Sequence, residues 1–224
     1  DVILTFTLTA PKDVALVANG ATSLSVLALL DSCAVSALPG RACNSGFPAQ
    51  VRTRALPAGT YFVVVASAPW SASGGDAIDV EVTFTEPTAP PTNESCAAPL
   101  DVSAGGRFPG SFVSVGDDIT LPCGYSRTPD LAYTFELLTP RDVQITATSA
   151  TRDTINGAVY SVCGSPTDVL RCTGGVPFDT TMNSLPAGTY FIVLDGLSDR
   201  ASEFTLDVTF SDPTPVPMGE TCAN

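Results

Sequence analysis

LPAGTYFVVV occupies Leu56–Val65, and LPAGTYFIVL occupies Leu185–Leu194. In both stretches a Pro and a Gly, typical of a tight turn, precede a run of aromatic and β-branched residues, which is typical of a β-strand. The run lacks polar alternation, as expected for a strand near the middle of a sandwich. The repeated phrase therefore predicts that one structural unit occurs twice in the chain.

The similarity extends over most of each unit. DVILTFTLTAPKDVALV, from Asp1, aligns with DLAYTFELLTPRDVQIT, from Asp130, at an offset of 129 residues. Towards the end of each copy the offset falls to 126, because a loop around SAPWSASGGD in the first copy is three residues longer, and loop insertions are tolerated at low cost. A period of about 127 residues indicates tandem domains rather than small stacked repeats.

Short clusters rich in Val, Ile, Thr, Tyr and Phe, separated by turn residues, predict strands. In TLDVTF, Leu206, Val208 and Phe210 alternate with polar residues, which predicts a half-buried strand. No window offers a convincing helix. We expect an all-β protein of tandem antiparallel jelly-roll-like β-sandwiches, with about eight strands per unit, joined by Pro-rich linkers. The expected segments are an incomplete first repeat (1–84), a linker (85–92), a complete second repeat (93–210), a second linker (211–218) and the start of a third repeat (219–224).

The charge and residue composition of the chain exclude several classes of partner and of catalytic site. The formal charge of −13 disfavours binding to nucleic acid, and no stretch approaches the roughly 20 apolar residues of a membrane-spanning helix. The chain contains no histidine, which excludes the usual Ser-His-Asp and Cys-His catalytic arrangements. We expect no catalytic residues and no enzyme activity.

The seven cysteines follow the repeat. Similar short spacings predict the disulfides Cys33–Cys43 and Cys163–Cys172, which leaves Cys96 with Cys123. Cys222 has no evident partner in the chain and is a candidate for a disulfide between repeats. A zinc site is the alternative, but histidine and close C-x2-4-C pairs are missing. Disulfides imply an oxidising compartment, so we expect an extracellular or cell-surface protein.

Other candidate site residues carry weaker signals. Asp117, Asp118, Asp130 and Asp195 could supply oxygen ligands to calcium, but their spacing forms no EF-hand, and acidic residues in turns are the alternative. No other cofactor is expected. Trp70, in the longer loop of the first unit, could stack on a sugar or another chain, or could pack over its own domain.

The order of motifs in the second unit resembles that of the bacterial pre-peptidase C-terminal domain, and the first unit shows most of the same order. The motifs are PDLAYTFELLTPRDVQIT, GAVYSVC, SLPAGTYFIVLDG and SEFTLDVTF, with Ala-Gly-Thr-Tyr at Ala58–Tyr61 and Ala187–Tyr190 as the most specific part. The resemblance implies a jelly-roll-like β-sandwich with an extracellular, non-catalytic role. It also implies a tandem, cysteine-containing version from a secreted or surface repeat protein.

Two functions remain open. The first is a structural repeat protein of a stalk, filament or surface layer, whose partners are neighbouring repeats or identical chains. The second is a module that binds extracellular polysaccharide or matrix protein and tethers a secreted enzyme. Because Asp1 aligns with Asp130, the first unit lacks a counterpart of Asn93–Pro129. We therefore expect a longer polypeptide, with a cysteine about seven residues before Asp1 and a partner for Cys222 about 27 residues after it.

Overall fold

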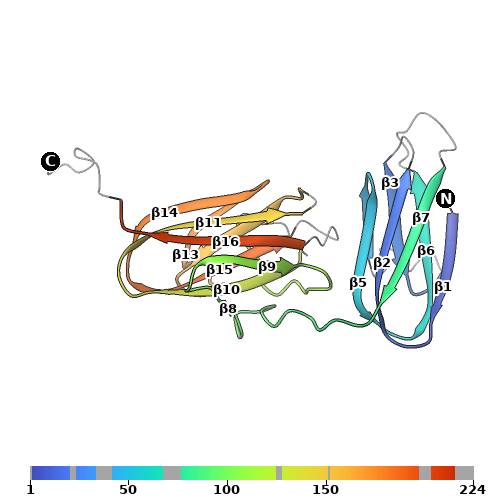
Figure 1. Cartoon of the computed structure of the whole chain (residues 1–224), viewed down its shortest axis with the longest axis horizontal. Helices are drawn as coiled ribbons and strands as arrows, with labels where there is room; N and C mark the ends of the chain where they lie inside the picture. Colours follow the sequence, from blue (N-terminus) through green and yellow to red (C-terminus); the bar gives the residue numbers. More distant parts are fainter. Residues whose placement is uncertain are drawn as a thin grey trace. The chain divides into compact units, whose positions relative to one another are not determined.

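The computed structural model describes residues 2–20, 24–33, 42–67, 77–124, 128–150, 152–196 and 203–214. The chain forms two compact units, of which the first ends at Pro91 and the second begins at Thr92, and each is described by itself (Figure 1). All regular elements in the described ranges are β-strands. Among these residues there is no helix that could span a membrane.

The first unit contains two antiparallel sheets. Their strand orders are β1-β6-β3-β4 and β5-β2-β7. The strands are β1 (Val2–Leu8), β2 (Lys12–Gly20), β3 (Ser25–Leu30), β4 (Ala42–Gly46), β5 (Ala49–Leu56), β6 (Gly59–Ser67) and β7 (Ile78–Thr85). One apolar cluster combines residues of both sheets, including Leu16 of β2, Leu27 of β3 and Val63 of β6. The two sheets therefore enclose a single core, as in a sandwich.

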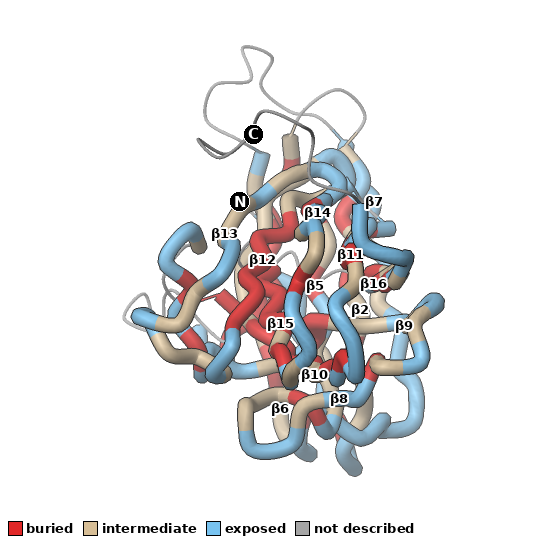
Figure 2. The backbone as a smooth tube through the Cα atoms, turned by 90° about the vertical axis from the view of Figure 1, so that its left-hand side faces the viewer, coloured by how far each residue is buried: buried red, intermediate tan, exposed pale blue. Residues whose placement is uncertain are grey.

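The second unit repeats this plan with one further strand in each sheet. The orders are β13-β12-β15-β10-β8 and β14-β11-β16-β9. The strands are β8 (Leu100–Asp101), β9 (Gly106–Ser111), β10 (Asp130–Leu137), β11 (Arg141–Ser149), β12 (Ile155–Tyr160), β13 (Val169–Gly175), β14 (Phe178–Leu185), β15 (Gly188–Gly196) and β16 (Glu203–Ser211). Buried residues concentrate on β12 and β15, in the middle of the larger sheet (Figure 2).

These strands form where side-chain alternation matches the pleat of a sheet. On β16, Leu206 and Val208 are buried, whereas Thr209 is exposed. Burial of each large aliphatic side chain contributes about 1.5 to 3 kcal/mol. The expected all-β, antiparallel sandwich fold is confirmed, with seven strands in the first unit and nine in the second among the described residues.

The repeated Gly-Thr-Tyr phrase marks the same turn in both units. Tyr61 and Tyr190 are buried, and their hydroxyls donate to the carbonyl oxygens of Pro57 (2.9 Å) and Pro186 (3.0 Å). Each ring thus covers the end of a sandwich while its hydroxyl closes the preceding turn, as expected for an amphipathic aromatic residue.

Candidate functional site

Residues 92–129 of the second unit, here called the arm, follow the edges of both sheets before β10 begins. Within the arm, β8 pairs in parallel with β10, and β9 pairs antiparallel with β16. Asn93 extends the first contact, since its carbonyl accepts a hydrogen bond from the Ala132 amide (2.8 Å) and its side-chain amide donates to the Ala132 carbonyl (3.0 Å). The arm therefore supplies one of the two edge strands of each sheet, β8 and β9.

The later part of the arm covers the outer face of the larger sheet. Ile119 and Leu121 belong to an apolar cluster with Ala132 of β10, Ala158 of β12 and Val193 of β15. Ala132 lies between Leu131 and Tyr133 on its strand, so its side chain faces away from the core between the sheets. This second, smaller cluster removes apolar surface of the sheet from water.

Two disulfides fasten the arm to the second unit. Cys96 is bonded to Cys163 and Cys123 to Cys172, with a Cα–Cα distance of 5.7 Å in each pair. All four residues are disulfide-bonded, but the predicted pairings Cys96–Cys123 and Cys163–Cys172 are wrong.

Strand register explains why the nearest cysteines in sequence do not pair. Cys172 lies opposite Ala158 in the β12–β13 ladder, and Cys163 follows Ala158 by five residues. Cys163 lies beyond the end of β12 at Tyr160, toward the turn of the hairpin, whereas Cys172 lies within the ladder, and a disulfide needs a Cα–Cα distance below about 7 Å. The ladder thus keeps Cys163 away from Cys172 and leaves both available to the arm.

The first unit has the same register. Cys43 lies opposite Ala28, and Cys33 follows Ala28 by five residues, so the predicted Cys33–Cys43 disulfide is wrong for the same reason. Cys33 is an exposed free thiol. The expectation for Cys222 relied on a Cys96–Cys123 pair, and Cys222 lies outside the described residues.

The proposed calcium ligands gather near the start of β10. Asp130 and Asp195 are register partners on β10 and β15, and only 0% and 1% of their surfaces are exposed. One carboxyl oxygen of Asp130 accepts hydrogen bonds from the amides of Asp118 (2.8 Å) and Ile119 (2.9 Å). Asp130 therefore also holds the arm in place.

The remaining oxygens of this pair, Oδ1 of Asp130 and Oδ1 of Asp195, have no hydrogen-bond partner. Burial raises the pKa of Asp130 to about 6, and the negative charges of Asp118 and Asp117 raise it further against the opposing amide hydrogen bonds. Burial likewise raises the pKa of Asp195 to about 7, against a hydrogen bond from Thr128. Desolvation and mutual repulsion thus favour protonation of the pair.

This acid pair does not fit calcium. Calcium takes six to eight oxygen ligands, whereas the pair presents two unpartnered carboxyl oxygens. No three acidic or cysteine side chains in the described ranges are placed to hold a metal ion. No role for calcium follows from Asp117, Asp118, Asp130 and Asp195.

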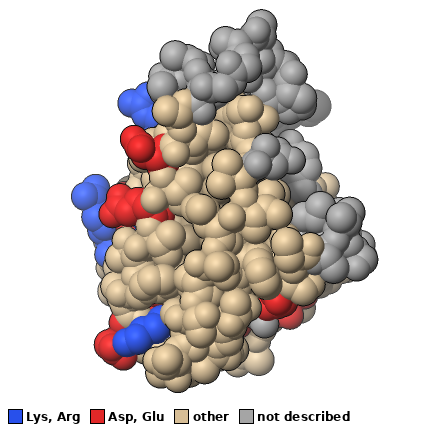
Figure 3. Space-filling view, turned by 90° about the vertical axis from the view of Figure 1, so that its right-hand side faces the viewer, with Lys and Arg blue, Asp and Glu red and all other residues tan. Residues whose placement is uncertain are grey.

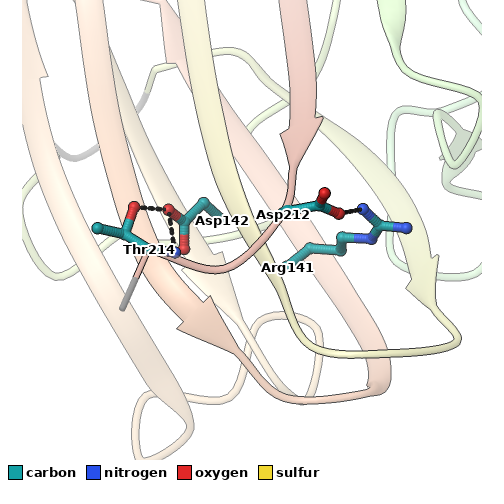
Figure 4. A network of polar contacts seen from close by, with 4 residues as sticks. All are labelled: Arg141, Asp142, Asp212 and Thr214. Atoms are coloured by element: carbon teal, nitrogen blue, oxygen red, sulfur yellow. Dashed lines mark hydrogen bonds and ion pairs between the residues drawn. The ribbon is translucent and has the colours of Figure 1, made fainter. Parts of the chain in front are cut away.

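Two further aspartates, which the sequence analysis did not single out, hold the segments that leave each sandwich. Oδ2 of Asp142 accepts hydrogen bonds from the amide (3.0 Å) and the hydroxyl of Thr214 (Figure 4). Its Oδ1 accepts one from the Ser184 amide (2.7 Å). An ion pair between Arg141 and Asp212 lies beside them. We call this arrangement the Asp–Thr clamp.

The first unit contains the same clamp. Oδ2 of Asp13 accepts hydrogen bonds from the amide (3.0 Å) and the hydroxyl (2.6 Å) of Thr88, and its Oδ1 accepts one from the Ala55 amide (2.7 Å). Lys12 and Glu86 form the neighbouring ion pair. Each clamp therefore joins the sandwich to the first threonine after its last strand.

A β-bulge in each unit explains why an aspartate is needed. The β2–β5 register shifts between Lys12 and Val14, and the β11–β14 register shifts between Arg141 and Val143. A bulge leaves one residue outside the regular pairing of the ladder. At the bulge, the amide of Ala55 in the first unit and that of Ser184 in the second donate to the carboxylate of the clamp. The signal in the sequence was the repeated pairing of PKDV with TEPT and of PRDV with SDPT.

The hydrogen bonds of the clamps stabilise the ionised carboxylates. The Thr214 hydroxyl, followed by the Ser184 amide, lowers the pKa of Asp142. Burial acts to raise the pKa of Asp13, but the hydrogen bonds from Thr88 and Ala55 outweigh it, so the net pKa is lowered. Both clamps are therefore closed at neutral pH.

Trp70 lies outside the described residues. A shallow pocket above the Cys96–Cys163 disulfide is lined by residues that include Ile119, Pro122 and Pro166. The arm and the clamp of Asp142 organise the second unit, and the chain is a disulfide-bonded protein of two β-sandwich units.

No protein-family model and no curated protein matches this chain. Among solved structures, the pre-peptidase C-terminal domain of collagenase from Bacillus anthracis is 12% identical, with a TM-score of 0.37, and the match covers 49% of this chain and 93% of that domain. A Clostridium perfringens protein with a catalytic domain and two CBM51 domains is 7% identical, with a TM-score of 0.28.

The second match covers 95% of this chain but 33% of the other, so this chain spans about a third of that protein's length. The first is a domain of the family that the motif order resembles. At these TM-scores neither similarity carries an argument, so the fold assignment rests on the sheets themselves. Membership of the pre-peptidase C-terminal family stays a prediction.

Proposed function

We propose that the chain is part of an extracellular, non-catalytic structural protein that forms a stalk, filament or surface layer from successive sandwich units. The observation that carries this proposal is the Asp–Thr clamp, which occurs once in each unit and holds the same Pro-Thr step after the last strand. A proline-rich segment is already semi-rigid. Fixing its first residues to the sandwich restricts the direction in which the next unit follows.

The disulfides support the extracellular part of the proposal, because such bonds persist in oxidising compartments. In this interpretation residues 1–84 are an incomplete repeat, 93–210 a complete one, and 219–224 the start of a third, with Cys222 in a disulfide between repeats. The partners are neighbouring repeats or identical chains.

Electron microscopy of the native material tests the proposal. We expect fibres or layers of regularly spaced particles. Dispersed monomers that bind polysaccharide or matrix protein tightly would contradict it and would favour the tethering module. A glycan array with the Trp70→Ala variant would then show whether this tryptophan carries the binding.

The clamp itself is tested by small-angle X-ray scattering of the 224-residue chain. Asp13→Ala removes the carboxylate that holds Thr88, so we expect a broader distribution of distances between the two units. Asp79→Ala, an exposed acid on β7, is the matched control with the same change of charge. Equal distributions for both variants would remove the clamp from the proposal.

A further inference from the structure

The segment that joins the two units is held at its first end by two side chains of the first unit. Asp13 accepts hydrogen bonds from the amide and the hydroxyl of Thr88. Arg54 of β5 adds two more, because its Nη1 atom donates to the Thr88 hydroxyl oxygen (2.9 Å) and to the carbonyl oxygen of Ala89 (3.1 Å). The Thr88 hydroxyl thus donates to an acid and accepts from a base, and the hold on the linker extends to Ala89.

The position of this arginine differs between the repeats. The repeated phrase aligns Arg54 with Asn183 of the second unit. The guanidinium of arginine is a permanently charged group with several donors in a fixed plane, and the side chain of asparagine is shorter and uncharged. The Asp–Thr clamp is therefore common to both units, whereas the additional charged donor belongs to the linker that follows the first unit.

The second end of the segment is held by the second unit. The carbonyl of Asn93 accepts a hydrogen bond from the Ala132 amide (2.8 Å), and its side-chain amide donates to the Ala132 carbonyl (3.0 Å). Asn93 is only 7% exposed, and a buried polar group that loses its partner is costly. Asn93 is thus fixed to the edge of the larger sheet at β10.

Three residues, Pro90, Pro91 and Thr92, lie between these two anchors. Each proline ring fixes its own φ at about −65°, and each proline also restricts the residue before it to extended conformations. The ψ angles of Ala89 and Pro90 are therefore restricted as well. The backbone angles that stay free to turn are ψ of Pro91 and both angles of Thr92.

We propose that the two units move relative to each other at one hinge, formed by Pro91 and Thr92, and that Arg54 sets where this hinge begins by holding Ala89 to the first unit. The linker is then a short, stiff extension of the first sandwich and not a flexible tether. The hinge is a property of a single chain and goes beyond the proposed function, which concerns assembly. Electron microscopy of fibres therefore does not decide it.

Two glycine substitutions, one on each side of the two prolines, test the hinge in the 224-residue chain. Ala89→Gly and Thr92→Gly add similar backbone freedom, and both positions are exposed, so neither variant removes core contacts. Small-angle X-ray scattering reports the distribution of distances. We expect Thr92→Gly to broaden this distribution and Ala89→Gly to leave it as in the wild type, because Ala89 is held.

Arg54→Met removes the guanidinium and keeps a long side chain. We expect the Thr88 amide to exchange its hydrogen with solvent about fivefold faster, because a neighbouring anchor is lost. Ala89→Gly should broaden the distribution once it is combined with Arg54→Met, by more than the sum of the single variants. Arg171→Met, which changes an exposed arginine on β13, is the control with the same change of charge.

Association between chains would also broaden the scattering. Figure 3 shows a broad face whose centre is free of charged side chains among the described residues, and net charge helps to keep proteins monomeric. The scattering curves are therefore extrapolated to zero concentration before the variants are compared.

Three results would overturn the proposal. The first is a broadening by Ala89→Gly as large as that by Thr92→Gly, because the held part of the linker would then not be stiff. The second is an unchanged distribution in Thr92→Gly. The third is a double variant no broader than Arg54→Met alone, because the hold on Ala89 would then not depend on Arg54.

Discussion

At the scale of single residues, the acid pair of the second unit sets a pH dependence of stability. The carboxyl of Asp195 has a pKa of about 7 in the folded protein and an ordinary value of 3.8. Between these values the native state binds a proton that the unfolded state does not, so the contribution to stability is complete below pH 3.8 and is lost as the pH rises through 7. Asp130, with a pKa of about 6, acts in the same direction.

We expect the second unit to be more stable at pH 5 than at pH 8, by about 1 to 3 kcal/mol. Asp195→Asn keeps this position neutral and should remove most of the difference by stabilising the unit at pH 8. Urea unfolding at both pH values measures the effect. Asp179→Asn, an exposed acid on β14, should retain the wild-type dependence. A stability that rises from pH 5 to pH 8 would contradict the assignment.

Some residue roles could be predicted from the sequence and others could not. The buried ring and the bonded hydroxyl of Tyr190 follow from a large amphipathic residue placed directly after a turn. The role of Asp142 depends on a bulge in β14 and on a threonine 72 residues away. Such a contact is visible in sequence only through the repeat, because the same pairs of motifs occur twice.

At the scale of the elements, the disulfides show where sequence spacing misleads. Loop length alone favours closure of the short Cys163–Cys172 loop, but the β12–β13 ladder separates these residues along the hairpin. The arm crosses the sheet and brings Cys96 and Cys123 to them instead. The strands could be predicted from local patterns, whereas the pairing depends on a register that is fixed only by the whole sheet.

Removing one arm disulfide should destabilise the second unit. The double variant Cys123→Ser with Cys172→Ser opens a link with a sequence separation of 49 residues, which is worth about 4 kcal/mol in the chain-entropy description. Chemical denaturation followed by circular dichroism measures the loss. Cys33→Ser is the control and should change stability by less than about 0.5 kcal/mol, since Cys33 is an exposed free thiol. A similar loss in both variants would contradict the pairing.

At the scale of the whole molecule, the two units share a plan but differ in how completely they are covered. The second has an arm, two disulfides and a second apolar cluster beneath the arm. In the first unit, β1 and β7 have no outer neighbour among the described residues. Alignment of the repeats predicted that a segment equivalent to the arm is lacking. The alignment could not show that the arm supplies an edge strand to both sheets. One of these strands, Leu100–Asp101, is too short to be recognised from its sequence pattern.

This difference predicts two separate thermal transitions for the 224-residue chain in scanning calorimetry, with the first unit melting at the lower temperature. Trp70 is the only tryptophan and belongs to the first unit by sequence, so its fluorescence assigns the lower transition. A reducing agent opens both disulfides of the second unit and should lower the upper transition by at least about 10 °C. The lower transition should not move, because the two described disulfides, Cys96–Cys163 and Cys123–Cys172, both lie in the second unit. A reductant that shifts the lower transition, or one cooperative transition under both conditions, would show that the stability of the units is not divided in this way.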